Sequence, residues 1–370
     1  MSLNSENIAQ ILNANWFGSS NAIEISHISI DSRSMQNGVG TLFFALVGPN
    51  NNGHNYIAEL IQKGVRNFVV NTIPDNLNEK ANFLVVENTL DALQKFAGYY
   101  RNLYHFPIIG ITGSNGKTIV KEWLNFLLSP DFSIIRSPKS YNSQLGVPLS
   151  LLELTTDTTM GLIEVGISMP GELKALEELI KPTHAIVTSF FPNESSLNEE
   201  LLRFLASIPN AYAGESHAML PQHVTLLDQQ AANPELKNVV FTDQVSIKSA
   251  TIAIGFSKQL VHDSAFFLEQ VSTLRRLALR LETFNGKNNT IVVNDTYNLD
   301  LEALKYSLDY LSSFDRTRPH CIYVGLDANS LWMKPQLEEL IQPYNPTHVF
   351  IDLPESLPHA IPEGAVVLIK

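Results

Sequence analysis

A short stretch in the first half of the chain, GSNGKT at residues 113–118, has the residue types that hold phosphates. Its two glycines permit backbone conformations that a Cβ would hinder, and its lysine adds a full positive charge. A helix that begins at Thr118 would direct its free N–H groups and the positive end of its dipole at the same point. We therefore expect this loop to hold the β- and γ-phosphates of a nucleotide, with the Thr118 hydroxyl on Mg²⁺. The candidate nucleotide-binding residues are Gly113, Ser114, Asn115, Gly116, Lys117 and Thr118.

The segments on either side of this loop are those that a phosphate site requires. Ile108, Ile109 and Ile111 predict a short buried strand before it, and apolar residues at helical spacing follow Thr118. The strict G-x-x-x-x-G-K-[ST] spacing is not met, because Ile111 stands where its first glycine would be. An ordinary strand–helix turn with a solvated lysine is the alternative interpretation of the same residues.

Length and composition limit the classes of function. A chain of 370 residues exceeds one ordinary core, which favours two or three domains. A net charge of −12 disfavours a nucleic-acid partner, since such proteins usually present a basic face. The single cysteine, Cys321, excludes an internal disulfide and a cysteine-based zinc site, and it fits a reducing compartment. With no signal peptide and no membrane-length apolar run, we expect a cytoplasmic protein without a membrane partner.

Apolar strands alternate with helices along most of the chain, which predicts an α/β protein with helices covering parallel sheets. We expect three domains, at residues 1–105, 106–283 and 284–370. The last of these stops on an apolar strand at Lys370, which predicts an incomplete domain. The expected helices include residues 4–13, 55–63, 89–104, 249–259, 264–275, 300–313 and 335–342.

Several stretches of the chain resemble the Mur ligases of peptidoglycan synthesis. Residues 28–70 resemble the family's N-terminal uridine-nucleotide domain, and GITGSNGKT resembles its ATP loop. Residues 137–154 and 163–189 are similar to its central domain, while RLE at 280–282 and NDTYN at the start of 294–311 resemble the entry to its C-terminal domain. The resemblance implies a three-domain architecture: an N-terminal uridine-nucleotide domain, a shortened central P-loop domain and a Rossmann-like C-terminal domain, the last incomplete.

Within the family, the chain most resembles ligases that add D-alanyl-D-alanine to UDP-N-acetylmuramoyl-tripeptide. The motifs SPKSYNSQLGVPLS and GISMPGE most resemble the form of these ligases that is fused to an alanine racemase. The resemblance implies ATP and Mg²⁺ as cofactors, these two compounds as small-molecule substrates, and an acyl phosphate as the intermediate. It also implies a fused or separate alanine racemase as a partner, although no racemase sequence is present in these 370 residues.

The resemblance assigns catalytic roles to three residues, Lys117, Glu164 and Arg280. Glu164 would join Thr118 on the metal, and Arg280 would reach the transferring phosphate, to which a guanidinium is well shaped. Glu164 ends an apolar strand, and ligands of open α/β sheets bind at that edge. The alternatives are a solvated strand-end carboxylate for Glu164 and a surface arginine for Arg280.

The remaining assignments concern the two substrate-binding ends. Ser32 and Arg33 would bind the pyrophosphate of the uridine nucleotide, and Asn142 would contact the substrate or a metal-bound phosphate. Asp295 would accept hydrogen bonds from the ATP ribose, with Asn298 completing the family's D-x-Y-N pattern. An Asx turn is the alternative for Asn142, and a turn and helix cap for Asp295 and Asn298.

Three features of the family's pattern are missing. After HAIVTS the chain reads FFPNESSLNEE, without the histidine that would help to hold a second metal. The next helix, LNEELLRFLASI, has Arg203 but no lysine to be carbamylated, and DQVSIKSATIA lacks the His-Asn pair that packs against adenine. We therefore predict a partly degenerate ligase, with a catalytically impaired nucleotide-binding relative as the alternative. A folylpolyglutamate-synthase-like ligase is disfavoured by the DSR…GH stretch, and an unrelated P-loop kinase by NDTYN.

Overall fold

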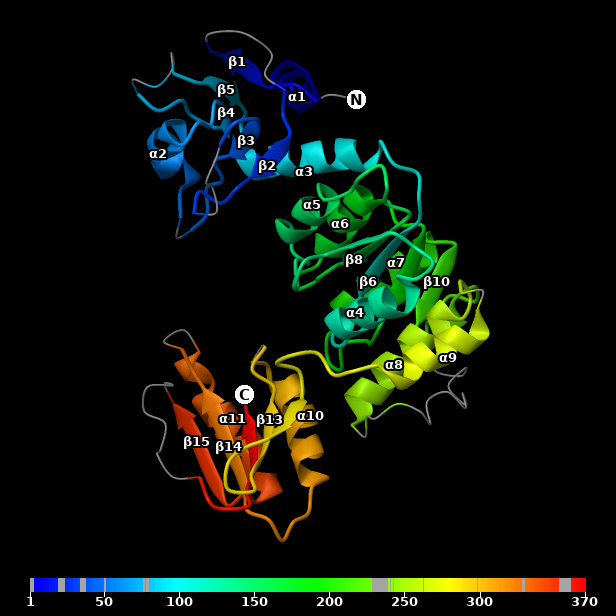
Figure 1. Ribbon diagram of the computed structural model, residues 1–370. Coiled ribbons are helices and arrows are strands. Elements are labelled where there is room, and N and C mark those ends of the chain that lie inside the picture. Colours follow the sequence, from blue (N-terminus) through cyan, green and yellow to red (C-terminus); the bar gives the residue numbers. More distant parts are fainter. Residues whose placement is uncertain are drawn as a thin grey trace. The chain divides into compact units, whose positions relative to one another are not determined.

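The computed structural model describes most of the chain (Figure 1). The described residues are 3–18, 24–33, 38–49, 51–75, 77, 80–227, 239, 241, 243–261, 263–297, 299–327, 330–352 and 361–370. The chain divides into two compact units, and each is described by itself. The first unit comprises residues 1–121 and 128–225, and the second comprises residues 122–127 and 226–370.

The first unit opens with a five-stranded sheet and three α-helices. These elements are α1 (Ser5–Leu12), β1 (Asn15–Phe17), β2 (His27–Ser29), β3 (Thr41–Phe44), α2 (Ile57–Gln62), β4 (Asn67–Val70), β5 (Asn82–Val85) and α3 (Thr89–Arg101). The strand order is β1-β5-β4-β3-β2, with β1 antiparallel to β5 and the other neighbours parallel. Separate apolar cores cover its two faces, one formed with α1 and α3 and the other with α2.

A second, central sheet follows, and its elements lie in the same unit apart from residues 122–127 of α4 and Leu226 of β11. Its elements are β6 (Ile108–Thr112), α4 (Lys117–Leu128), β7 (Ile134–Arg136), α5 (Gly146–Leu151), β8 (Met160–Glu164), α6 (Glu172–Ile180), β9 (His184–Val187), α7 (Ser195–Ser207), β10 (Asn210–Ala213) and β11 (Thr225–Leu226). The strand order is β11-β10-β9-β6-β8-β7, and β7, β8, β6, β9 and β10 pair in parallel. The segments that follow β6, β7, β8 and β9 therefore lie at one edge of this sheet.

Helix α3 connects the two sheets of the first unit (Figure 1). Ala92, Leu93 and Phe96 on this helix lie in the core of the first sheet. At its C-terminal end the buried Arg101 donates from Nε to the Ile180 carbonyl at 2.8 Å and from Nη2 to the Lys181 carbonyl at 3.2 Å. These bonds satisfy carbonyl groups that the end of α6 leaves without helical partners, so they join α3 to the central sheet.

The described part of the second unit contains four α-helices that follow α7 and a third sheet. Its elements are α8 (Gln244–Ser257), α9 (Ser264–Ser272), β12 (Glu282–Asn285), β13 (Ile291–Asn294), α10 (Leu301–Ser312), β14 (His320–Gly325), α11 (Lys334–Ile341), β15 (His348–Asp352) and β16 (Val366–Ile369). The strand order is β12-β13-β16-β14-β15, with only β12 antiparallel to its neighbour among these strands. Helices α10 and α11 pack on one apolar core of this sheet. Because β12 begins at Glu282, this sheet starts two residues before the predicted third domain.

The predicted α/β class is confirmed, with three sheets. Five strands, β1, β7, β10, β11 and β12, were not among the expected elements, since runs of two to four residues carry little periodicity. The helix expected from residue 249 begins at Gln244, because the Asp243 side chain accepts a hydrogen bond from the Ser246 N–H at 2.8 Å and caps it earlier. In the part of the chain that the structure describes, no helix is long and apolar enough to span a bilayer.

Candidate functional site

The phosphate loop follows β6 at the carboxyl edge of the central sheet. Residues of β6 are all buried, and the loop then turns through Gly113 at φ 129° and Gly116 at φ 85°. A Cβ on Gly113 would lie 2.5 Å from Thr188 Oγ1, so glycine is needed for the loop to lie against the end of β9. Helix α4 begins at Lys117, with its N-terminus directed at the loop as the sequence predicts.

Hydroxyl groups after β9 hold the loop in place. Ser189 Oγ lies 2.7 Å from Ser114 Oγ and accepts a hydrogen bond from the Asn115 N–H at 2.9 Å. Thr188 Oγ1 donates to the Asn115 carbonyl at 2.5 Å. Thr188 and Ser189 were not among the predicted site residues, although two hydroxyl residues directly after an apolar strand are a signal for such a role.

Lys117 lies over the loop that it follows. Its Nζ donates to the Gly113 carbonyl at 2.6 Å and to the Ser114 carbonyl at 3.0 Å. The ammonium group is therefore at the loop, where phosphate oxygens would replace these two carbonyl acceptors.

Glu164 and Thr118 are in direct contact. Glu164 is the last residue of β8 and is 1% exposed. Thr118 Oγ1, in the first turn of α4, lies 3.1 Å from Glu164 Oε1 and 3.0 Å from Oε2. The two residues predicted to share a metal ion are thus brought together by neighbouring parallel strands, 46 positions apart in the sequence.

The segment after β7 completes this group of oxygen atoms. Asn142 Nδ2 donates to Glu164 Oε1 at 3.0 Å, and Ser140 Oγ lies 3.0 Å from Thr118 Oγ1. The Gly166 N–H donates to the Asn142 carbonyl at 2.7 Å, and a Cβ on Gly166 would lie 2.9 Å from that oxygen. Gly166 therefore permits the close approach that holds Asn142 beside Glu164. Ser140 was not predicted as a site residue.

The donor set fits a magnesium ion that arrives with a nucleotide. Carboxylate, hydroxyl and amide oxygens are the hard ligands that Mg²⁺ prefers, and it is commonly held by one or two carboxylates together with substrate phosphates. Glu164 and Thr118 provide the carboxylate and the hydroxyl, and the amide of Asn142 adjoins them through its hydrogen bond to Glu164. Within the described ranges, no group of three or more His, Cys, Asp or Glu residues could hold a metal ion by itself.

The predicted uridine-nucleotide contact lies in the first sheet's half of the unit. Arg33 forms a two-fold ion pair with Asp31, Nε to Oδ1 at 2.9 Å and Nη2 to Oδ2 at 3.0 Å, and its side chain is 88% exposed. These hydrogen bonds lower the pKa of the Asp31 carboxyl and raise that of Arg33. Ser32 is buried, and its carbonyl accepts a hydrogen bond from Lys63 Nζ at 3.4 Å. An exposed guanidinium next to Ser32 is available to an anion from solution.

His54, in the same half, is a packed ring. Its Nδ1 lies 2.9 Å from Asn52 Oδ1, and its Nε2 accepts a hydrogen bond from the Asn71 N–H at 3.3 Å. Burial lowers the pKa of this imidazole, which fits the neutral form that these two bonds require.

The third sheet holds the other predicted nucleotide contacts. Asp295 follows β13 and accepts hydrogen bonds from the Leu281 N–H at 3.2 Å and Ser307 Oγ at 2.6 Å, and it pairs with Lys370 Nζ at 2.5 Å. Its carboxylate thus already accepts hydrogen bonds from three groups of its own unit. The Arg280 guanidinium lies 3.9 Å from the centre of the Tyr297 ring. Asn298 lies outside the described residues.

One departure from the family pattern, the absent lysine, falls on α7. The predicted helix is present, and Arg203 on it lies 3.7 Å from both Glu177 Oε2 and Glu200 Oε2. This arginine is therefore held in a group of carboxylates on the side of α6 and α7. No lysine occurs between Ser195 and Ser207.

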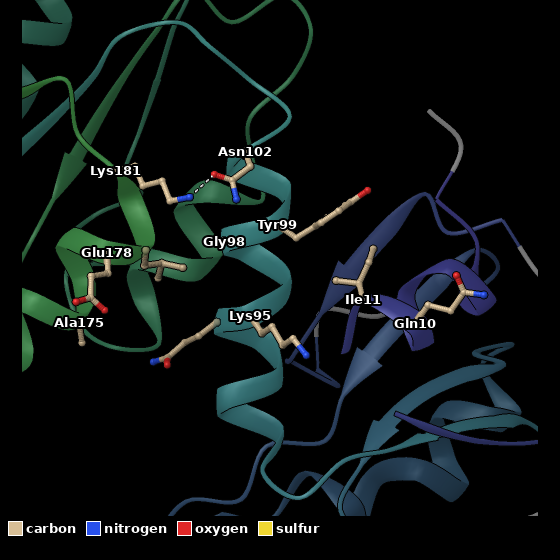
Figure 2. Close-up of a pocket in the computed structure, with 11 residues that line it drawn as sticks. Gln10, Ile11, Lys95, Gly98, Tyr99, Asn102, Ala175, Glu178 and Lys181 are labelled. Carbon is tan, nitrogen blue, oxygen red and sulfur yellow. Dashed lines mark hydrogen bonds between the residues drawn. The ribbon is translucent and has the colours of Figure 1, made fainter. Parts of the chain in front are cut away.

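A pocket of about 790 Å³ lies away from these residues, between α1, α3 and α6 (Figure 2). Its charged lining residues are Lys95, Glu178 and Lys181, and Lys181 Nζ donates to Asn102 Oδ1 at 2.7 Å. None of the residues predicted to bind substrate or nucleotide lines it, so it is separate from the phosphate loop.

Known protein families match the first unit in sequence order. The model described as Mur ligase family, catalytic domain, matches residues 24–101, and the Mur ligase middle domain matches residues 111–193. A UDP-N-acetylmuramoyl-tripeptide--D-alanyl-D-alanine ligase from Synechocystis is 26% identical over 327 residues, which cover 79% of this chain and 70% of that protein. The ligase of the same name from Rickettsia prowazekii is 33% identical over 189 residues, covering 51% of this chain and 40% of the relative.

Solved structures extend the likeness to the third sheet. A crystal structure of MurF from Acinetobacter baumannii has a TM-score of 0.76 at 17% identity, covering 100% of this chain and 96% of that chain. The MurF ligase from Thermotoga maritima, in complex with ADP, has a TM-score of 0.69 at 19% identity, with 93% of each chain covered. Such identities establish a common fold, and the family models show that residues 24–101 and 111–193 match Mur ligase domains.

Proposed function

We propose that this chain is an ATP-dependent ligase that joins D-alanyl-D-alanine to UDP-N-acetylmuramoyl-tripeptide through an acyl phosphate. The names of the Synechocystis and Rickettsia relatives supply the two substrates. The observation that carries the proposal is the contact between the Thr118 hydroxyl and the buried Glu164 carboxylate, at the head of the helix that follows the phosphate loop.

The chain's own residues would act on the nucleotide by position and charge. The N–H groups of residues 113–118 would bind phosphate oxygens, and Lys117 would exchange its bonds to Gly113 and Ser114 for bonds to the outer phosphates. Mg²⁺, held by Thr118 and Glu164 with Asn142 nearby, would neutralise phosphate charge when bound. The tripeptide carboxylate would attack the γ-phosphorus and release ADP. The amine of D-alanyl-D-alanine would then attack the acyl carbon, and phosphate would leave.

The remaining predicted contacts stay part of the proposal on the strength of the resemblance. Ser32 and the exposed Arg33 would hold the pyrophosphate of the uridine nucleotide, as a guanidinium does in two-fold contacts with oxyanions. Arg280, Asp295 and Asn298 would contact the ATP. For Asp295, three existing hydrogen-bond donors leave a single acceptor position, so a structural role competes with the ribose contact.

Phosphate release from ATP tests the proposed reaction. The purified chain is incubated with ATP and Mg²⁺, then with the UDP-linked tripeptide, with D-alanyl-D-alanine, and with both. We expect release to require both substrates and to stop when Mg²⁺ is chelated. Nucleotide binding without substrate-dependent release would instead support the impaired relative, for which Arg203 and the lack of a lysine on α7 are the motivating observation. Phosphate release that is the same with and without the two substrates would contradict the ligase proposal.

A further inference from the structure

A fully buried lysine lies one turn into α4, close to the Thr118–Glu164 contact. Lys121 is 0% exposed, and its Nζ lies 3.6 Å from Glu164 Oε2. The same ammonium group donates to the Ser137 carbonyl at 2.7 Å and to the Lys139 carbonyl. Lysine is almost never fully buried unless it is paired, because desolvation of its charge is costly. The position of this cation therefore calls for a function at the neighbouring site.

One consequence of these bonds is mechanical. The backbone from Ser137 to Asn142 carries two side chains of the site: Ser140, 3.0 Å from Thr118 Oγ1, and Asn142, 3.0 Å from Glu164 Oε1. Lys121 binds the start of this segment from α4, the helix that also carries Thr118. The segment after β7, the end of β8 and the first turn of α4 are thus fixed to one ammonium group.

The second consequence is electrostatic. The Glu164 carboxylate lies 3.6 Å from the Lys121 ammonium group, and the phosphate loop before α4 carries a second ammonium group, that of Lys117. A divalent cation that approaches alone meets repulsion from both, and the interaction is strong in a partly desolvated environment. A polyphosphate brings negative charge of its own and reverses that balance.

We propose that Lys121 is a positioning residue of the nucleotide site, which fixes the 137–142 segment and Glu164 around Thr118 and makes the site accept Mg²⁺ with a nucleotide rather than Mg²⁺ alone. This inference rests on the proposed function, because it takes the ligand to be a metal–nucleotide complex. It extends that function by naming the residue that couples metal binding to nucleotide binding.

Manganese supplies the test, because free Mn²⁺ is counted directly by electron paramagnetic resonance. In the unaltered chain we expect Mn²⁺ with ADP to bind far more tightly than Mn²⁺ alone. In Lys121→Met, Mn²⁺ alone should bind at least about tenfold more tightly, because a cation near Glu164 is gone. Mn²⁺ with ADP should bind about tenfold less tightly, because the 137–142 segment is released and a phosphate-attracting charge is lost. Opposite changes of this kind do not follow from a general loss of structure.

Lys139→Met is the matched control, since Lys139 lies in the same segment but is exposed. It removes one positive charge while its carbonyl still accepts from Lys121, and both affinities should stay within about twofold. Equal weakening of both ligands in Lys121→Met, or no change in either, would overturn the proposal. Failure of the unaltered chain to bind Mn²⁺ with ADP would overturn the proposed function instead, while binding of Mn²⁺ alone still reports on Lys121.

A second variant keeps the inference testable where Lys121→Met folds poorly. Glu164→Gln combined with Lys121→Met removes both charges at nearly constant volume, so no buried charge is left without its partner. Its melting temperature should exceed that of Lys121→Met alone. A double variant that is no more stable than the single one would show that the two side chains are not coupled, and the proposal would fail.

Discussion

Thr118 Oγ1 contacts both oxygens of the Glu164 carboxylate, at 3.1 and 3.0 Å, inside a part of the central sheet that water scarcely reaches. The hydroxyl begins a helix and the carboxylate ends a strand, and the pairing of β6 with β8 places the two together. Helix α4, which carries Thr118 in its first turn, begins at the phosphate loop, so a cation bound by these two groups would lie beside phosphate bound at the loop.

The first prediction concerns the charge of that carboxylate. Glu164→Gln retains the shape of the side chain and an acceptor for Thr118, but it removes the anionic ligand. We expect Mg²⁺ to increase ADP affinity in the unaltered chain and to have no effect in the variant, a loss of about tenfold or more. Calorimetric titration of ADP with and without Mg²⁺ measures this. Glu178→Gln, at an exposed position on α6, is the control and should retain the full Mg²⁺ effect.

The second prediction concerns the close approach of the phosphate loop to β9. Gly113→Ala should lower the free energy of unfolding by about 2 kcal/mol or more, because the new Cβ meets Thr188 Oγ1 at 2.5 Å and the backbone has φ 129°. Gly171→Ala is the control, since Gly171 has φ 93° but no atom within 4 Å of the added Cβ. Denaturant unfolding of both variants separates the clash from the backbone strain. Equal losses in the two would mean that packing against Thr188 is not the constraint.

The third prediction concerns the connection between α3 and α6. Arg101→Met should lower the free energy of unfolding by about 3 kcal/mol, because the carbonyl groups of Ile180 and Lys181 lose charged hydrogen-bond donors in a buried place. Arg33→Met, at an exposed position, should change it by less than about 0.5 kcal/mol. Chemical denaturation followed by circular dichroism gives both values. A loss in Arg101→Met no larger than that of the control would contradict the role assigned to this side chain.

The fourth prediction concerns acid sensitivity of the first unit. Burial lowers the pKa of His54 and of His184 below the ordinary value of 6.5. Above pH 6.5 both residues are neutral in the folded and unfolded chain, so they do not make stability depend on pH. As the pH falls below 6.5, the unfolded chain binds protons that the folded chain does not, and stability falls until the lower folded-state pKa values are passed. Replacing both residues with Asn should flatten the stability curve as the pH falls below 6.5, measured by urea unfolding at several pH values. If the free energy of unfolding depends on pH as steeply in the variant as in the unaltered chain, other titrating groups cause the dependence.

Local patterns in the sequence were sufficient for the loop and for most of the architecture. The strand at 108–112, the glycine turn and the helix that follows are encoded within about twenty neighbouring residues, and so they were predictable. That Glu164 lies beside Thr118 also followed, because parallel strands end at one edge of a sheet.

Contacts made by tertiary packing were not predictable in the same way. Lys121 has the spacing of an ordinary helix residue, and only the fold buries it beside Glu164. Ser189 and Ser140 reach the site from segments whose local sequence resembles a turn. The strand β7 has three residues, too few to show the alternating pattern of a strand. The segment that follows it nevertheless places Asn142 at the site.

Helix α3, which shares the core of the first sheet and is bonded through Arg101 to the end of α6, gives the first unit one continuous frame. The anchor proposed for the sugar nucleotide and the anchor proposed for the phosphates are built into that frame at a set separation. An elongated substrate would then reach both anchors only if its length matched the distance between them. We expect UDP-linked precursors with a shorter peptide to compete for binding yet fail to trigger phosphate release, and release with such a truncated precursor would contradict this.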